Sequence, residues 1–158
     1  MVALEVLWLP QELAPSSLAD SRVVVIDVIR ATTSITTALA AGSQRVIPTG
    51  SVAAARATAD QIGGSLLCGE RNGLPPEGFD FGNSPREFIP ELVAGESLIF
   101  TTTNGTAAIE VVTDARELRI ACFRNVGAVG RVLSNPTDTK SGPIVIICSG
   151  RNGRIGMD

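Results

Sequence analysis

The chain contains no histidine among its 158 residues. This absence excludes several catalytic arrangements built from side chains of this chain: Ser-His-Asp and Cys-His nucleophiles, histidine-ligated zinc and a phosphohistidine intermediate. Acid–base catalysis or metal binding must therefore use aspartate, glutamate, cysteine, lysine or bound water.

Aromatic residues and excess positive charge are also scarce. Tyrosine is absent, aromatic residues make up 4% of the chain, and the formal net charge is −3 with a sequence pI of about 5.0. Nucleic-acid binding ordinarily uses a basic surface and aromatic stacking platforms. We therefore expect no nucleic-acid partner.

Long apolar runs are missing as well. The longest, such as Val23–Ile26 and Ile144–Cys148, are too short to span a bilayer. The first residues do not pair a basic segment with an apolar one, as a signal peptide would. These features predict no membrane partner and a cytoplasmic location.

Cysteine is rare and odd in number. Cys68, Cys122 and Cys148 each lie at or near the end of an apolar run. This pattern predicts reduced, mostly buried thiols rather than a disulfide scaffold.

Hydrophobic residues, in contrast, make up 44% of the chain, enough for a folded core. Short β-rich runs alternate with helical segments, which predicts an α/β fold: three layers, α/β/α, with a largely parallel or mixed sheet in a single domain spanning residues 1–158. Strands are expected near 2–8, 22–27, 44–48, 65–68, 97–101, 118–122 and 143–148. Helices are expected at 33–41, 51–62, 85–93, 105–113 and 125–134. The sequence shows no internal repeat.

The helix expected at 85–93 has the clearest start signal. Ser84 is in the N-cap position of a capping box, with Pro85 first and Glu87 third in the helix. Pro90 would end or kink this helix early. Gly42 and the Gly63-Gly64 pair are typical of helix C-caps.

Polar segments rich in glycine and small hydroxyl residues accompany the predicted strands. In open α/β sheets, ligands bind beyond the carboxyl ends of the strands. Glycine lets backbone N–H groups approach a ligand, and helix N-termini favour anions. The turns at Thr32–Ser34 and Asn104–Thr106 are therefore predicted phosphate cradles. The five segments span residues 27–34, 69–73, 78–84, 101–106 and 149–153.

Three of these segments contain one arginine each: Arg30, Arg71 and Arg151. A guanidinium group offers a fixed fork of donors that matches phosphate, carboxylate and sulfonate oxygens. If the three converge, they would suit a ligand with several anionic groups. The alternative is that they are surface arginines paired with nearby carboxylates.

Three carboxylates are candidates for the chemistry. Asp27 ends the most apolar strand and could be a metal ligand, a nucleophile or a helix N-cap. Glu70 and Asp80 add oxygen donors on neighbouring loops, which suits Mg²⁺. The alternative for both is ordinary loop solvation or turn formation.

Two phosphatase patterns match only in part. The haloacid-dehalogenase pattern requires a second aspartate where this chain has Ile29. Cys148 and Arg154 have the spacing of the thiol phosphatases, but Ile155 stands where a hydroxyl residue is expected. We therefore interpret Cys148 as a buried strand terminus.

Taken in order, the five polar segments resemble those of the 2-phosphosulfolactate phosphatase family. The matching motifs are Val25–Thr33, Gly69–Gly73, Phe79–Pro85, Thr102–Thr106 and Ser149–Gly153, and the resemblance covers residues 3–154. It implies a Mg²⁺-dependent hydrolase that converts 2-phospho-3-sulfolactate to 3-sulfolactate and phosphate in coenzyme M biosynthesis. The phosphate, sulfonate and carboxylate of that substrate agree with the three arginines.

The resemblance and the residue patterns together give a set of candidate site residues. Asp27, Glu70 and Asp80 are the predicted catalytic residues, and Asp27 and Glu70 the predicted Mg²⁺ ligands. The predicted substrate- and phosphate-binding residues are Arg30, Thr32, Thr33, Arg71, Asn72, Asn83, Thr103, Asn104, Gly105, Thr106, Ser149, Arg151 and Asn152.

Members of the family look longer, continuing after the last motif with an acidic segment and further α/β elements. We therefore expect a chain shortened at its C-terminal side, or one completed by another copy in a homo-oligomer. The alternative functions are a non-catalytic binding protein for a phosphorylated or sulfonated small acid and a structural subunit.

Overall fold

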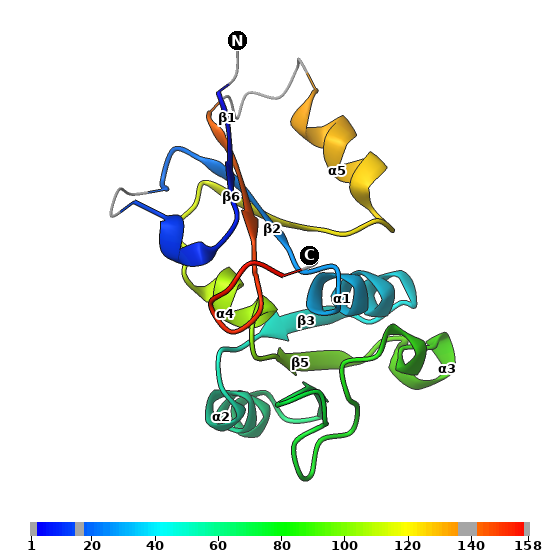
Figure 1. Ribbon diagram of the computed structural model, residues 1–158. Helices are drawn as coiled ribbons and strands as arrows, with labels where there is room; N and C mark the ends of the chain where they lie inside the picture. Colours follow the sequence, from blue (N-terminus) through cyan, green and yellow to red (C-terminus); the bar gives the residue numbers. More distant parts are fainter. Residues whose placement is uncertain (1–2, 15–17, 136–141, 157–158) are drawn as a thin grey trace.

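The computed structural model describes residues 3–14, 18–135 and 142–156, in which strands and helices alternate (Figure 1). The strands are β1 (Leu4–Leu7), β2 (Arg22–Ile26), β3 (Arg45–Pro48), β4 (Ser65–Gly69), β5 (Ser97–Thr101), β6 (Glu117–Ala121) and β7 (Ile144–Cys148). The α-helices are α1 (Ala31–Ala40), α2 (Val52–Ile62), α3 (Pro90–Val93), α4 (Gly105–Glu110) and α5 (Val126–Leu133), with 3-10 turns η1 (Pro10–Glu12) and η2 (Pro85–Glu87). Each predicted strand is therefore confirmed, and so are four of the five predicted helices.

The helix predicted at 85–93 is wrong as a single element. The Glu87 carboxylate accepts a hydrogen bond from the Ser84 N–H, as the capping pattern requires, but only the η2 turn follows. Ile89 has an extended backbone, and α3 begins afresh at Pro90. Proline disfavours the helical conformation of the residue before it, which explains the break.

The prediction that the strands are largely parallel is confirmed. Each strand pairing in the described residues is parallel. The strands form two sheets rather than one, with orders β1-β7-β2-β6 and β3-β5-β4.

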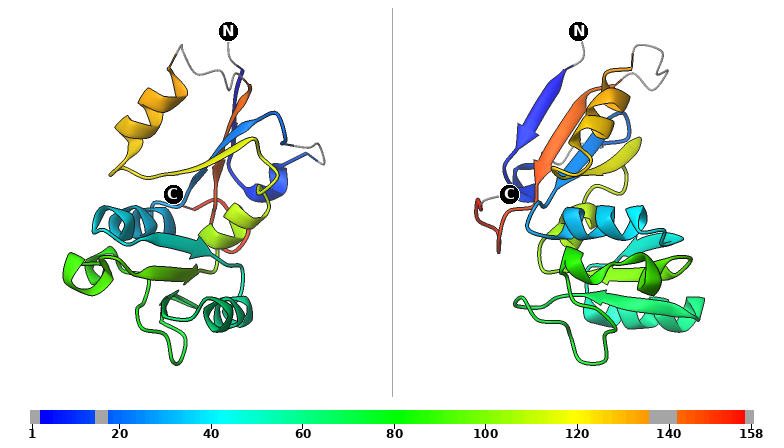
Figure 2. Two further views of the ribbon diagram at one scale, coloured as in Figure 1. Left: turned by 180° about the vertical axis from the view of Figure 1, so that it is seen from behind. Right: turned by 90° about the vertical axis from the view of Figure 1, so that its right-hand side faces the viewer.

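Helices α1 and α4 lie between the two sheets (Figures 1 and 2). Helix α1 contacts β3 and β6, α4 contacts β2 and β3, and the two helices contact each other. Helix α2 covers the other face of the three-stranded sheet, and α5 packs against β6. The middle layer is rich in small residues, Ala, Thr, Ser and Gly, which permit this close packing.

One hydrophobic core joins both sheets. It includes Val23 and Val25 of β2, Leu98 and Phe100 of β5, and Ile109 of α4. The three cysteines are buried and form no disulfide, as predicted. No helix in the described ranges is long and apolar enough to span a membrane.

The element order contains a repeat that the sequence did not reveal. Elements β2-α1-β3-α2-β4 are followed by β5-α4-β6-α5-β7, and each series ends in an Arg-Asn-Gly turn. The halves exchange their first strands, since β2 lies between β7 and β6 whereas β5 lies between β4 and β3.

The repeat extends to strand register and local hydrogen bonds. Arg22, the first residue of β2, is level with the first residues of β6 and β7, and Ser97 is likewise level with the first residues of β3 and β4. In α1 and in α4, the helices that follow β2 and β5, a threonine hydroxyl accepts a hydrogen bond from the residue just after the strand. Asp27 N–H donates to Thr32 Oγ1 (3.1 Å), and Thr102 N–H donates to Thr106 Oγ1 (2.9 Å). The two halves are therefore related by an approximate two-fold arrangement.

Candidate active site

A cleft of about 980 Å³ opens where the carboxyl ends of β2, β4, β5 and β7 meet. Both halves of the repeat contribute to it. Its lining residues are Asp27, Ile29, Arg30, Glu70, Gly73, Asn83, Thr102, Asn104, Gly150, Arg151, Asn152, Arg154, Ile155 and Gly156. Seven predicted site residues are among them, namely Asp27, Arg30, Glu70, Asn83, Asn104, Arg151 and Asn152.

Asp27 lies directly after β2 and is only 4% exposed. Its Oδ1 accepts a hydrogen bond from the Ala31 N–H (3.1 Å) at the first turn of α1. A Cβ placed on Gly105 would overlap its Oδ2, so the two residues are packed closely. Asp27 therefore stabilises the start of α1 and also lines the cleft.

The predicted phosphate-binding hydroxyls form bonds within the protein. Thr32 is fully buried, and its Oγ1 lies within hydrogen-bond distance of the carbonyl oxygens of Asp27 (2.8 Å) and Ala121 (2.7 Å). Thr33 Oγ1 donates to Val28 O (2.7 Å), and Thr106 Oγ1 donates to Thr102 O (2.9 Å). These hydroxyls fix the loops after β2 and β5 and do not line the cleft.

Glu70 follows β4 and is 9% exposed. Its Oε1 accepts a hydrogen bond from Thr103 N–H (2.7 Å), and its Oε2 accepts one from Gly73 N–H (2.8 Å). Burial raises the pKa of Glu70, but the hydrogen bonds from Thr103 and Gly73 and the charge of Arg71 outweigh burial and lower that pKa below its ordinary value. The ionised carboxylate thus links the turn after β4 to the segment after β5.

This lowered pKa predicts how the protein responds to acid. The folded pKa lies below the unfolded value of about 4.3, so the ionised carboxylate stabilises the fold above that pH. The stabilisation is lost as the pH falls through the folded pKa, because the protonated carboxyl accepts these bonds poorly. In urea unfolding with EDTA, Glu70→Gln should lower the free energy of unfolding at pH 7 and flatten its fall below about pH 4.3.

The control is Glu91→Gln, which removes an exposed carboxylate at the start of α3. This variant should follow the wild-type acid profile. An unchanged acid profile for Glu70→Gln would contradict the role assigned to the carboxylate.

The arginines of the cleft are not the predicted three. Arg30 and Arg151 line it, together with Arg154. Within the described residues, the guanidinium groups of these three form no hydrogen bond or ion pair. Three unpaired positive charges therefore face the cleft.

Arg71 has a different position. Its guanidinium donates to Glu70 O (2.7 Å), Gly50 O (3.2 Å) and Thr101 Oγ1 (2.8 Å). It therefore connects the loop after β4 to β5 and to the segment before α2, and it does not line the cleft.

Two Asn-Gly turns flank the site. Asn72 and Asn152 both have positive φ (55° and 51°), as do the glycines that follow them, which is the backbone of a tight hairpin turn. Asn72 is exposed at its turn tip, whereas Asn152 reaches the cleft and donates its N–H to Asn104 Oδ1 (2.9 Å). Ser149 is buried before the second turn, and its N–H donates to Ile26 O (2.8 Å).

The segment 78–84 is divided between the cleft and the outside. Asn83 lines the cleft and is 6% exposed, and its Oδ1 has no hydrogen-bond partner among the described residues. Asp80 is exposed, and its carboxylate accepts the N–H of Leu67 (2.8 Å), which attaches the loop to β4. The structure therefore does not bring Asp80 to the cleft with Asp27 and Glu70.

Several lining residues were not among the predicted site residues, including Thr102, Gly73 and Gly150, which lie within the polar segments, and Arg154. Arg154 had one usable signal, its position after an Asn-Gly turn. The two residues that flank such a turn form a pair, and Arg151 and Arg154 are indeed bridged.

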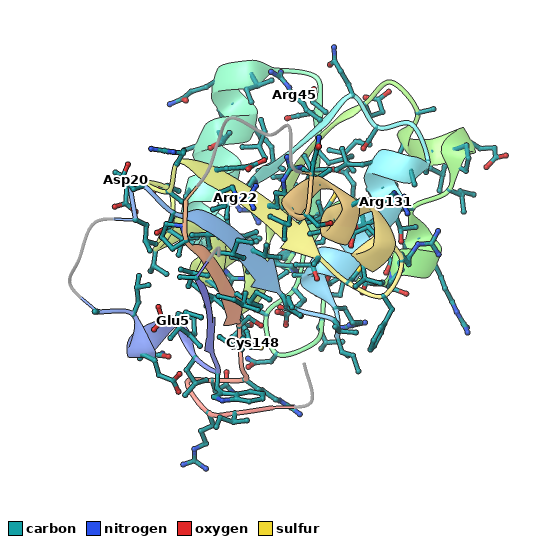
Figure 3. All side chains as sticks on the ribbon, turned by 90° about the horizontal axis from the view of Figure 1, so that it is seen from above. Glu5, Asp20, Arg22, Arg45, Arg131 and Cys148 are labelled. Carbon is teal, nitrogen blue, oxygen red and sulfur yellow. The ribbon has the colours of Figure 1, made fainter. Side chains whose placement is uncertain are left out.

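Cys148 lies at the end of β7, beside the turn into the 149–156 loop (Figure 3). It is buried, and it is absent from the cleft lining. This position agrees with a strand terminus and gives no support to a thiol-phosphatase site.

Comparisons with known proteins identify the family to which the chain is similar. The model of the family described as 2-phosphosulpholactate phosphatase matches residues 7–158. Proteins named "Probable 2-phosphosulfolactate phosphatase" are 45% identical over 144 residues in Caldanaerobacter subterraneus (89% of this chain, 58% of the relative), 42% over 147 residues in Thermotoga petrophila (92% and 61%) and 40% over 156 residues in Pseudothermotoga lettingae (98% and 63%). The chain thus spans about three-fifths of the length of these curated relatives. With a match over nearly its whole length, from before β2 to beyond the second Arg-Asn-Gly turn, the chain belongs to the 2-phosphosulpholactate phosphatase family.

Proposed function

We propose that this chain forms the site of a Mg²⁺-dependent phosphatase that hydrolyses 2-phospho-3-sulfolactate to 3-sulfolactate and phosphate. One observation carries the proposal: three unpaired arginines and two buried carboxylates share one cleft. The name of the relatives supplies the substrate. Its phosphate, sulfonate and carboxylate are anions that guanidinium groups bind well.

The residues present fit a magnesium ion that keeps water or substrate oxygens as ligands. No cluster of three or more histidine, cysteine or acidic side chains occurs in the described part of the chain. Mg²⁺ nevertheless needs only one or two carboxylates besides substrate and water oxygens. Asp27 and Glu70 would supply these, and Asn83, which lines the same cleft, has a further oxygen, Oδ1, without a hydrogen-bond partner among the described residues.

The side chains of the chain then have distinct roles. Bound Mg²⁺ would offset negative charge on the transferring phosphoryl group. Arg30, Arg151 and Arg154 would bind the anionic oxygens and stabilise the charge that develops on them. Asp27 would act either as principal metal ligand or as nucleophile. Glu70 would be the second metal ligand while it holds the loop after β4 in place.

The test is phosphate release from 2-phospho-3-sulfolactate and from 2-phospholactate, which lacks the sulfonate, each in Mg²⁺ and in EDTA. Release that requires Mg²⁺ and favours the sulfonated substrate is the expected result. Equal release in EDTA would contradict the metal mechanism. Tight binding without release would support the non-catalytic binding protein instead. We place this activity, as the family resemblance implies, in cytoplasmic coenzyme M biosynthesis.

A further inference from the structure

The two-fold repeat places Glu70 and Ser149 in equivalent positions. The N–H of Glu70 donates to Thr101 O at the end of β5 (2.9 Å), and the N–H of Ser149 donates to Ile26 O at the end of β2 (2.8 Å). Both residues are buried. Glu70 directly precedes its Arg-Asn-Gly turn, whereas Gly150 lies between Ser149 and the second turn. A glutamate in one half therefore corresponds to a serine in the other.

In the first half, Glu70 supplies a negatively charged carboxylate at the turn that follows β4. The Glu70 carboxylate binds the N–H groups of Thr103 and Gly73 across the space between the strand end and the turn. The arginine of this turn, Arg71, donates instead to backbone carbonyls. The turn after β4 therefore holds a built-in oxyanion, and its own arginine does not line the cleft.

The turn after β7 has the opposite balance of charge. Ser149 provides no carboxylate, and the turn that follows is held by the neutral amide of Asn104. Arg151 and Arg154 flank that turn, line the cleft and are unpaired within the described residues, as is Arg30. Positive charge thus collects where the built-in carboxylate is missing.

We propose that Arg30, Arg151 and Arg154, which line the cleft, form with the buried Ser149 a seat that binds the phosphate group of the substrate. This seat corresponds to the position that the Glu70 carboxylate occupies at the turn after β4. The seat lies beside the reacting residues, because the pairing of Ile26 with Cys148 makes Asp27 and Ser149 neighbours on adjacent strands. The inference rests on the proposed function for its substrate. The ligand class, a phosphate oxyanion, follows from the positive charge of the three arginines and from the carboxylate that stands at the equivalent position after β4.

Ser149→Glu tests the proposal, because it installs in the second half the carboxylate that the first half already has. The probe is inorganic phosphate, titrated calorimetrically into the intact chain. Ser149→Glu should weaken phosphate binding by at least about a hundredfold, because the new carboxylate pairs with the arginines and repels the ligand. Ser149→Gln, similar in size but neutral, should weaken it much less.

The control for net charge is Gln61→Glu on the exposed surface of α2, which should bind phosphate as the wild type does. Circular dichroism and thermal unfolding establish whether Ser149→Glu is folded. If it is not, Arg154→Gln replaces it, and the expected result is at least about a tenfold loss of phosphate affinity. Binding by the folded Ser149→Glu variant at wild-type affinity would overturn the proposal, and so would a wild-type chain that binds no phosphate.

The same measurements separate this seat from the proposed reaction. A chain that releases no phosphate from any phospho-acid, yet binds phosphate and loses that binding in Ser149→Glu, supports the seat while the proposed function fails. A chain that hydrolyses its substrate while Ser149→Glu leaves phosphate binding unchanged overturns the seat and leaves the proposed function standing.

Discussion

Asp27→Ala is expected to reduce phosphate release on the order of a thousandfold while the protein remains folded. The residue lines the cleft next to the proposed phosphate seat, and loss of a metal ligand or nucleophile removes several kcal/mol of transition-state stabilisation. The fold should lose the hydrogen bond from Ala31 N–H to Oδ1, worth about 1 kcal/mol at a helix start. Initial rates at saturating Mg²⁺ and urea unfolding of the same preparations measure the two effects separately.

Asp27→Asn is the matched control for this result. Asparagine keeps an oxygen that can accept from Ala31 N–H but removes the charge, so stability should return while activity does not. More than about a tenth of the wild-type rate in Asp27→Ala would exclude a principal catalytic or metal-binding role, since so small a loss corresponds to only about 1.4 kcal/mol.

The secondary structure could be predicted because each element has a local signal. The buried strands are continuous apolar runs, as in Val23–Ile26, and α2 begins at a Ser51 side chain that accepts from Ala54 N–H and ends at Gly63 with φ 65°. The prediction failed where two local signals conflict. The capping pattern at Ser84 and Glu87 favours a helix, but Pro90 interrupts it within two turns.

The two-sheet arrangement had no such local signal. Which strand lies beside β2 depends on contacts between residues about 120 positions apart, such as Val23 with Val145. The repeat is equally hidden, because the halves share element order and hydrogen bonds but few identical residues. The Arg-Asn-Gly turns are the part of it that remains readable in the sequence.

The location of the site was predicted better than the roles of its individual side chains. Strand-end loops do converge, which brings Asp27, Glu70 and Arg151 into one cleft. Short side chains next to a strand end, however, also reach nearby backbone carbonyls, and Thr32 and Thr33 do so. Arg71 has a longer side chain, but its guanidinium donates to two backbone carbonyls and one hydroxyl and does not line the cleft.

Gly105→Ala is expected to damage both the fold and the site through a single added methyl group. A Cβ at residue 105 would lie within 3.0 Å of Asp27 Oδ2 and of Ala31 Cβ. Ala31 cannot yield, because its Cβ is attached to the backbone of α1, so α4 must move or Asp27 must rotate. Overpacking of this kind costs about 1–3 kcal/mol. We also expect a loss of phosphate release on the order of that in Asp27→Asn, because the carboxylate is displaced from its place beside Ala31.

Gly130→Ala in α5 is the matched control, since a Cβ at that helical position meets no atom within 4 Å. It should raise the free energy of unfolding by about 0.5–1 kcal/mol, as expected for alanine in place of glycine within a helix, and leave phosphate release unchanged. Rates are compared well below the unfolding midpoint, where all variants are folded, so that lost activity reflects the position of Asp27 rather than the folded fraction. If Gly105→Ala lowers stability but keeps the wild-type rate at that temperature, the close packing of Gly105 against Asp27 serves only the joint between α1 and α4.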